Sequence, residues 1–217
     1  IVNIPSGQST STIPIEFTLG DLDQSDKWVL PLRILDDPSY TVNTNKYYSR
    51  AMLRVNPFND YSGTYEGNLY KVFLEPDITN ALISSKVRTY VKDEKTIFVY
   101  AGLRDIEYLD RKDYKIFIKF TDDIIDIQKK KLEVYTDNPL INLNVKDAPA
   151  QYYTVTREKD EKKPYLETIT IRVGLEYSFE DYTTIPGTPI KYSVSGELVM
   201  ERRLNTLIPD EDQQIQW

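Results

Sequence analysis

The chain has 217 residues, 34 acidic and 27 basic side chains, and a formal net charge of −7. It contains no cysteine and no histidine, which excludes disulfide bonds, thiol nucleophiles, histidine-based catalytic triads and zinc sites built from these residues. The acidic balance, without a concentrated basic stripe, also argues against a nucleic-acid partner. We therefore expect a protein that is not an enzyme and that holds no cofactor.

The composition predicts an all-β protein. Tyrosine occurs 17 times, against 7 phenylalanines and 2 tryptophans. It accompanies many Thr, Ile and Val residues, the types that suit a pleated, half-buried surface. The length allows one large β domain or two modest ones, because a single core usually serves roughly 100 to 200 residues. No apolar run approaches the ~20 residues of a membrane-spanning helix.

Residues 1–57 predict the short strands of an immunoglobulin-like β-sandwich. Leu30, Leu32 and Ile34 alternate with other residues and so share one face of a strand, and a further strand covers 51–55. A complete sandwich of this type has about seven strands, more than this segment supplies. Because Ile1 is not an initiator methionine, we expect the natural chain to begin upstream, with this domain truncated at its N-terminus.

Residues 58–217 predict an up-and-down antiparallel β-barrel. The pattern restarts after Pro57, which makes that segment the expected domain boundary. Short polar turns join the strand-like runs, and eight successive antiparallel strands favour a closed barrel because closure removes exposed strand edges. The runs cover 64–74, 86–91, 96–100, 114–120, 131–135, 152–157, 165–177 and 190–203.

Helix is expected only as two short turns, over 78–85 and 122–130. The second has Asp122 and Asp123 at its start, where carboxylates favour the positive end of the helix dipole. The three lysines at 129–131 are expected on a solvated strand edge, where lysine discourages pairing with another chain.

Three stretches of the barrel segment carry a resemblance to a known family. They are DYSGTYEG (60–67), YSFEDYTT (177–184) and KYSVSGEL (191–198). Together they resemble the C-terminal, lipocalin-like barrel domain of a family of Bacteroides surface lipoproteins. The segments 4–15 and 29–34 are similar to the second half of the immunoglobulin-like domain that precedes the barrel in that family.

The resemblance implies a setting for the protein as well as a fold. Members of that family tend to be encoded beside glycan-import machinery, in polysaccharide-utilisation loci, although both of their domains are largely of unknown function. The resemblance therefore implies export to the outer-membrane surface and a lipid anchor on an upstream cysteine that this chain lacks. It also implies capture of polysaccharide or oligosaccharide, in company with other surface glycan-uptake proteins.

Aromatic side chains are the candidate ligand-binding residues, because the apolar face of a sugar ring packs well on an aromatic ring. Trp28 begins a predicted strand after a polar loop. Tyr47 and Tyr48 are adjacent, as are Tyr152 and Tyr153, so alternation along a strand places one ring of each pair outward. The alternative is that the inward ring belongs to the core and the outward ring packs across a neighbouring strand.

The acidic clusters predict neither a metal site nor an active site. Those at 36–37, 122–126 and 210–212 lack the twelve-residue spacing of a calcium loop and suit solvated turns. A glycosidase needs only two carboxylates. Asp105, Glu107 and Asp110 form the first group to consider for that role, yet their segment is typical of a polar loop between strands.

The sequence thus predicts a non-catalytic surface protein that binds glycan in support of polysaccharide uptake. Two alternatives stay open. One is a structural or adhesive module that contacts other proteins through the same outward aromatic rings. The other is a carrier of a small apolar ligand, which requires a hollow barrel.

Overall fold

The structure is a computed structural model, and it describes residues 6–8, 11, 13–16, 26, 28–35, 38, 49–54, 57–147 and 149–208. These residues form a two-stranded and a 12-stranded antiparallel sheet, so the predicted all-β class is confirmed. Within the described ranges, no helix has the length and hydrophobicity needed to cross a membrane.

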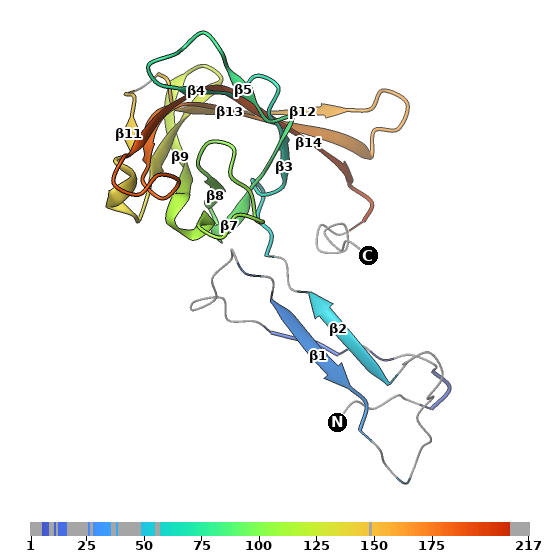
Figure 1. Ribbon diagram of the computed structural model, residues 1–217. Helices are drawn as coiled ribbons and strands as arrows, with labels where there is room; N and C mark the ends of the chain where they lie inside the picture. The colour runs from blue at the N-terminus through green and yellow to red at the C-terminus, as the bar shows by residue number, and fades with distance from the viewer. Residues whose placement is uncertain are drawn as a thin grey trace.

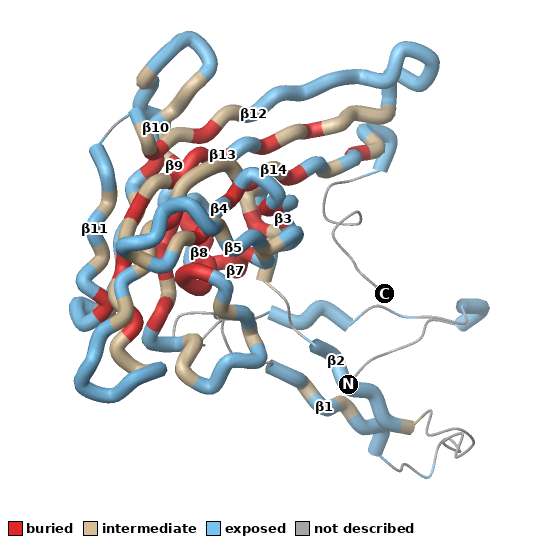
Figure 2. The backbone as a smooth tube through the Cα atoms, turned by 45° about the horizontal axis from the view of Figure 1, so that its top comes forward, coloured by how far each residue is buried: buried red, intermediate tan, exposed pale blue. Residues whose placement is uncertain are grey.

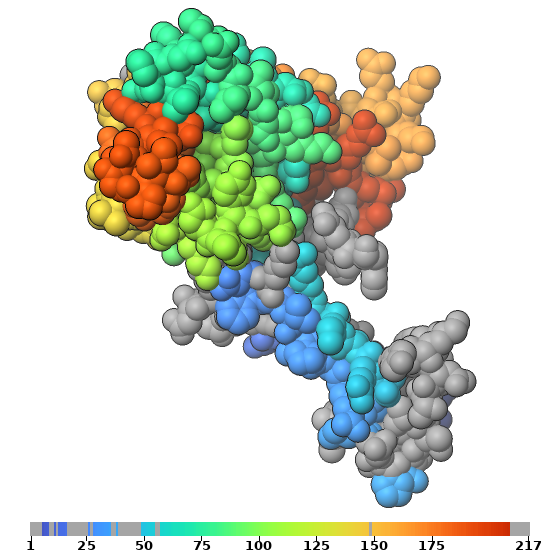
Figure 3. All heavy atoms as spheres, viewed as in Figure 1, coloured from blue at the N-terminus to red at the C-terminus, as the bar shows by residue number. Residues whose placement is uncertain are grey.

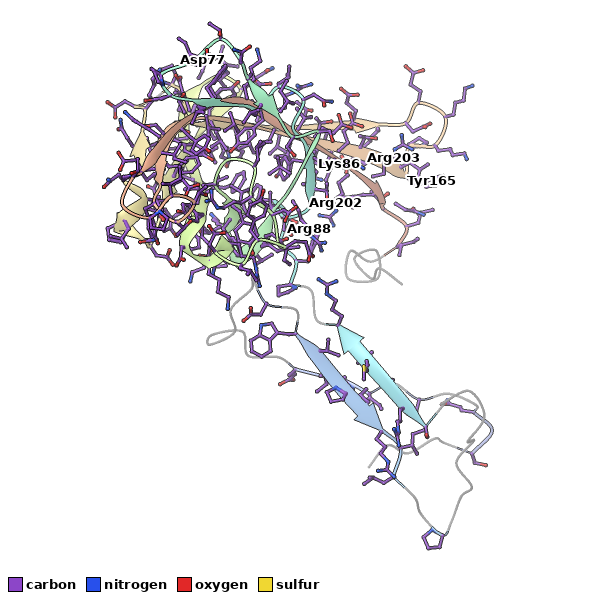
Figure 4. The ribbon with its side chains drawn as sticks, viewed as in Figure 1. Asp77, Lys86, Arg88, Tyr165, Arg202 and Arg203 are labelled. Carbon is purple, nitrogen blue, oxygen red and sulfur yellow. The ribbon has the colours of Figure 1, made fainter. Side chains whose placement is uncertain are left out.

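The smaller sheet pairs strand β1 (Val29–Arg33) with strand β2 (Arg50–Arg54). It lies within the segment for which the sequence predicts an immunoglobulin-like sandwich, and in Figure 1 it extends away from the larger sheet. The division of the chain into domains after residue 57 stays a prediction. The connecting chain is held to the larger sheet at Phe58, where the guanidinium carbon of Arg202 lies 4.6 Å from the ring centroid (Figure 4).

The larger sheet contains the rest of the strands that the structure describes. Two short 3-10 turns, Arg111–Tyr114 and Pro139–Ile141, lie in its loops. Its strands are β3 (Thr64–Glu66), β4 (Lys71–Leu74), β5 (Leu82–Ile83), β6 (Lys86–Arg88), β7 (Tyr90–Asp93), β8 (Thr96–Tyr100), β9 (Lys115–Asp126), β10 (Lys129–Tyr135), β11 (Asn144–Val145), β12 (Tyr152–Lys159), β13 (Leu166–Asp181) and β14 (Ile190–Asn205).

These strands curl into an up-and-down barrel, as predicted. From β7 the strand order runs β8, β9, β10, β12, β13 and β14, each antiparallel to the last. The short β3 then pairs with β14 at Val199 and with β6, which precedes β7 by one residue. The ring of pairings therefore ends at the chain segment where it began, and each of the eight predicted runs overlaps at least one of these strands.

The buried residues, most of them apolar or aromatic, lie on the strands of the barrel (Figure 2). Every second residue of β13 from Ile169 to Phe179 is buried, as alternation requires. Inside, the hydroxyl groups of Tyr70 and Tyr177 form a hydrogen bond of 2.6 Å. Each fully buried Val, Leu, Ile, Phe or Met side chain contributes about 1.5–3 kcal/mol to the free energy of folding by leaving water. The interior is packed, which argues against the alternative of an apolar ligand carried inside.

Three local predictions are wrong. Residues 78–85 form turns and β5, and 122–130 form the end of β9, a turn and the start of β10. Pairing of Ile124 with Lys130 keeps Asp122 and Asp123 in an extended strand, which outweighs their preference for a helix start. The lysine run at 129–131 is not at a sheet edge, because β10 pairs with β9 on one side and with β12 on the other.

Closure of the barrel depends on Gly196. Its φ is +131°, and β14 changes partner there, from β4 at residues 192–195 to β3 at Val199. A Cβ atom on Gly196 would collide with the carbonyl oxygen of Leu69, which lies in the turn between β3 and β4. Only glycine fits this conformation and this close backbone approach together.

We predict that Gly196→Ala is far more destabilising than Gly187→Ala. Gly187 also has a positive φ, +81°, but a Cβ there meets nothing within 4 Å. Gly187→Ala therefore costs about 1–2 kcal/mol, for the left-handed backbone alone. Gly196→Ala adds an overpacking cost of about 1–3 kcal/mol or prevents folding. Urea denaturation of both variants measures the difference, and equal midpoints would show that the collision is relieved without loss.

Candidate functional site

The two tyrosines of the predicted pair at 152–153 have different environments. Tyr153 is 3% exposed; its hydroxyl donates to the carbonyl oxygen of Thr121 at 2.7 Å. Tyr152 lies half-buried on the outer wall, over Gly174, and donates its hydroxyl to the carboxylate of Glu197. The Nζ of Lys129 is 3.9 Å from its ring centroid. The outward ring thus packs across neighbouring strands.

Of the other predicted residues, the structure describes only Trp28. Trp28 directly precedes β1 and is 39% exposed, whereas Tyr152 begins β12 of the barrel, so the structure does not gather these rings into one site. Tyr47 and Tyr48 lie outside the described residues.

A hollow of about 480 Å³ lies on the outer wall of the barrel, over β4, β14, β13 and β11. We call it the serine groove after the three side chains on its floor, Ser178, Ser193 and Ser195. They face outward because the alternate residues of β13 and β14, such as Tyr177 and Val194, face the core. The volume falls within the roughly 300–1,000 Å³ of ligand pockets.

The register of four strands builds the centre of the groove. Phe73 pairs with Ser193, Ser193 with Ser178, and Ser178 with Asn144. This row carries an aromatic ring at one end, an amide at the other and two hydroxyl groups between them. Since serine is short, longer side chains on either side of the row stand above it as the walls of the groove.

Charged side chains in ion pairs form those walls. On one side, the Nζ of Lys191 lies 3.2 Å from a carboxylate oxygen of Glu75; on the other, Lys146 pairs with Glu176. The charged residues lining the groove are thus two acidic and two basic, with no net charge. Such surface pairs contribute little stability, but they leave a polar groove in which each charge is already neutralised.

The turn between β4 and β5 supplies the apolar rim of the groove at Ile78. Asp77, at the tip of this hairpin (Figure 4), accepts hydrogen bonds from the backbone N–H of Thr79 at 2.8 Å and from its hydroxyl at 2.6 Å. Hydrogen bonds from Thr79, and then from Asn80, lower the pKa of Asp77 to about 2. The turn that holds Ile78 is therefore fixed by its own side chains.

A second polar cluster, which we call the mouth network, lies where the 101–110 loop meets the end of β13. The Nη2 of Arg104 is 2.8 Å from Asp181 and 3.2 Å from Asp110. Its guanidinium carbon is 3.7 Å from the ring centroid of Tyr114, whose hydroxyl donates to Asp181 at 3.0 Å. Thr183 donates to Asp110 at 2.6 Å. The network ties three loop segments to the barrel.

Hydrogen bonding stabilises the ionised carboxylates of the mouth network. Burial acts to raise the pKa of Asp181, but hydrogen bonds from Thr184 and then from Arg104 outweigh it and hold that pKa well below its ordinary value. Likewise, burial acts to raise the pKa of Asp110, and hydrogen bonds from Thr183 and Arg104 lower it. Both groups are anionic at neutral pH and serve as acceptors.

The structure assigns local bonding roles to the acidic residues first considered for catalysis or metal binding. Asp105 accepts a hydrogen bond from the backbone N–H of Glu107 at 2.8 Å, and Asp110 belongs to the mouth network. Asp122 forms ion pairs with Lys95 at 2.7 Å and Lys130 at 3.5 Å. Across the part of the chain that the structure describes, no group of three or more acidic residues could hold a metal ion.

Two family models match parts of the chain. A family model described as "-like, C-terminal" matches residues 49–199. The chain belongs to that family. Residues 1–38 match a domain of unknown function (DUF4973). No curated protein matches the chain.

Solved structures of similar proteins come from Bacteroides. A protein of unknown function from Bacteroides ovatus has a TM-score of 0.85 and 36% identity, over 97% of this chain and 69% of that one. An auxiliary nutrient binding protein from Bacteroides thetaiotaomicron has a TM-score of 0.79 and 36% identity, over 93% and 65%. A multidomain protein including DUF1735 from Bacteroides ovatus has a TM-score of 0.77 and 38% identity, over 93% and 65%. The chain thus spans about two thirds of their length.

We predict that Asp181→Asn destabilises the fold by about 3 kcal/mol or more, because it leaves Arg104 without one of its buried partners. The folded pKa of Asp181 lies below the unfolded value of about 3.9. Its stabilising effect is therefore complete above that value and disappears as the pH falls through the folded pKa. Urea denaturation from pH 7 down to pH 2 should show the difference between wild type and variant shrinking below about pH 4.

Asp77→Asn is the matched control for Asp181→Asn. Asp77 also has a lowered pKa, but its side chain is fully exposed, so its loss should change the unfolding midpoint much less. Equal effects of the two substitutions would contradict the role given to the mouth network.

Proposed function

We propose that this protein is a non-catalytic nutrient-binding protein of the cell surface, and that it binds glycan in the serine groove. The observation that carries the proposal is the groove itself, with one aromatic ring, three hydroxyl groups and an amide set between paired charges. An aromatic face with convergent hydrogen-bonding groups is the combination that suits a sugar ring. The likeness to a protein called an auxiliary nutrient binding protein supports the same class of function.

The chemistry of the groove favours an uncharged glycan. Lys146 and Lys191 are each neutralised by a glutamate, so a uronate or sulfate group would have to displace a carboxylate to find a cation. Hydroxyl groups of a neutral sugar can donate to the glutamates and accept from serine and asparagine without breaking either pair. The half-buried Phe73 ring would take the apolar face of one sugar unit.

The proposed setting is the one that the family resemblance implies. The protein would be exported, held at the outer-membrane surface by a lipid anchor upstream of this chain, and would act with other glycan-uptake proteins of a polysaccharide-utilisation locus. Support comes from the Bacteroides origin of the similar structures.

Affinity electrophoresis tests the proposal with gels that contain xyloglucan, galactomannan, mannan or polygalacturonate. We expect retardation by at least one neutral polysaccharide and none by polygalacturonate. Ser193→Trp places an indole on the floor of the groove and should weaken binding about tenfold or more. Thr170→Trp, at an outward position of β13 beyond the groove, should bind as the wild type does.

Three outcomes would contradict the proposal. If folded wild-type protein migrates freely in every gel, glycan binding is contradicted. If binding survives Ser193→Trp, the serine groove is not the binding site. If Tyr152→Ala loses binding while Ser193→Trp keeps it, the binding site is at Tyr152, the outward ring that the sequence predicts.

A further inference from the structure

The open end of the barrel holds a second pocket, which we call the mouth pocket. In Figure 3 the β4–β5 hairpin, the 101–110 loop and the segment after β13 meet on the face toward the viewer. Between them lies a hollow of about 190 Å³, whose apolar side includes Val72, Leu82, Leu103 and Phe179 and whose polar side includes Arg104, Asp181 and Thr184. Tyr108 and Tyr192 add two further rings. It is separate from the serine groove, with which it shares no lining residue.

Arg104 has donor capacity that the mouth network does not use. Its side chain is only 8% exposed. The Nε and Nη2 atoms contact Asp110 and Asp181, but within the described residues no hydrogen-bond partner reaches Nη1. A guanidinium carries five N–H groups, two of them on Nη1. Arg104 lines the mouth pocket and also an adjoining hollow of about 110 Å³, so a ligand can approach it from the barrel mouth.

The carboxylate in the pocket is, by contrast, already occupied. Asp181 accepts the hydroxyl groups of Tyr114 and Thr184 and the backbone N–H groups of Thr183 and Thr184, in addition to its contact with Arg104. An ionised carboxylate has about four acceptor positions. It therefore has little left to offer a ligand, and the pocket binds through a donor rather than an acceptor.

The net charge of the mouth network determines which kind of ligand the pocket can accept. One guanidinium stands against two carboxylates, Asp110 and Asp181, so the mouth network carries a net negative charge. A buried network of that sign repels an anion, even though Arg104 has donors that the network does not use. The fitting acceptor is uncharged, such as a hydroxyl or ring oxygen. The volume is below the roughly 300–1,000 Å³ of pockets for drug-sized ligands, which suits one small ring.

We propose that the mouth pocket binds a single uncharged sugar ring, with an oxygen of the ring accepting from Nη1 of Arg104 and its apolar face against Tyr108 or Tyr192. The ring is either a free monosaccharide or the terminal unit of a glycan chain. The choice of a sugar rests on the proposed function, whereas the pocket and its unused donors stand without it.

The test is a titration of ¹⁵N-labelled protein followed by NMR. The probes are the methyl glycosides of glucose, galactose, mannose and xylose, the matching oligosaccharides, and glucuronate as the anionic arm. We expect amide signals of residues 102–104 and 183–184 to shift with at least one neutral probe. A response to oligosaccharides alone identifies a chain end, and a response to methyl glycosides identifies a free sugar as sufficient.

Two matched substitutions on the β4–β5 hairpin separate binding from folding. Leu82 and Leu74 are similarly exposed, at 47% and 46%, but only Leu82 lines the pocket. Leu82→Trp should weaken binding of the neutral probe in the mouth pocket at least tenfold, while Leu74→Trp leaves that binding unchanged. The proposal is overturned by unchanged mouth signals with every neutral probe, by tighter binding of glucuronate, or by full binding in Leu82→Trp. Polysaccharide binding that needs Ser193, together with unchanged mouth signals for every neutral probe, would support the serine groove and contradict the mouth pocket.

Discussion

The pairing of β13 with β14 is the constraint on which the rest of the structure depends. These strands of 16 residues each stay in register along their whole length. Because alternate side chains face opposite ways, one pairing supplies the packed core of the barrel and, on the other face, the serine floor of the groove. A shift of register by one residue would exchange the two faces and destroy both. Stability and the proposed recognition site are thus set by the same hydrogen-bonded ladder.

The pairing is controlled in one way at its middle, where Gly196 lies opposite Leu175, and in another way at the end of β13. At residue 196 a glycine lets β14 leave β4 and pair with β3, which closes the ring of strands. At the end of β13 the buried charges of Arg104, Asp110 and Asp181 hold the neighbouring loops. A buried ion pair contributes little net stability compared with apolar packing, but removing one member is costly. The mouth network therefore fixes loop positions more than it adds to the free energy of folding.

Much of the fold could be predicted from sequence, and much of the site could not. Alternation along 165–177 and 190–203 predicts the long strands, and the count of runs predicts the barrel. The groove needs Phe73, Ser193, Ser178 and Asn144 in one row, and no local pattern shows which residues will lie opposite each other across four strands. Adjacent aromatic residues give a visible local signal, but the ring of Tyr152 covers Gly174. The pairing of Arg104 with Asp181, 77 positions apart, is equally invisible before folding.

The proposed site of polysaccharide binding is the outer face of β13 and β14. The most direct measurement is a crystal structure of the protein soaked in an oligosaccharide derived from a polysaccharide that retards it in the gel assay. We expect ordered sugar density along Ser178, Ser193 and Ser195, with one ring against Phe73 and both ion pairs intact. Sugar bound at Trp28 or at Tyr152, with the serine groove vacant, would contradict it.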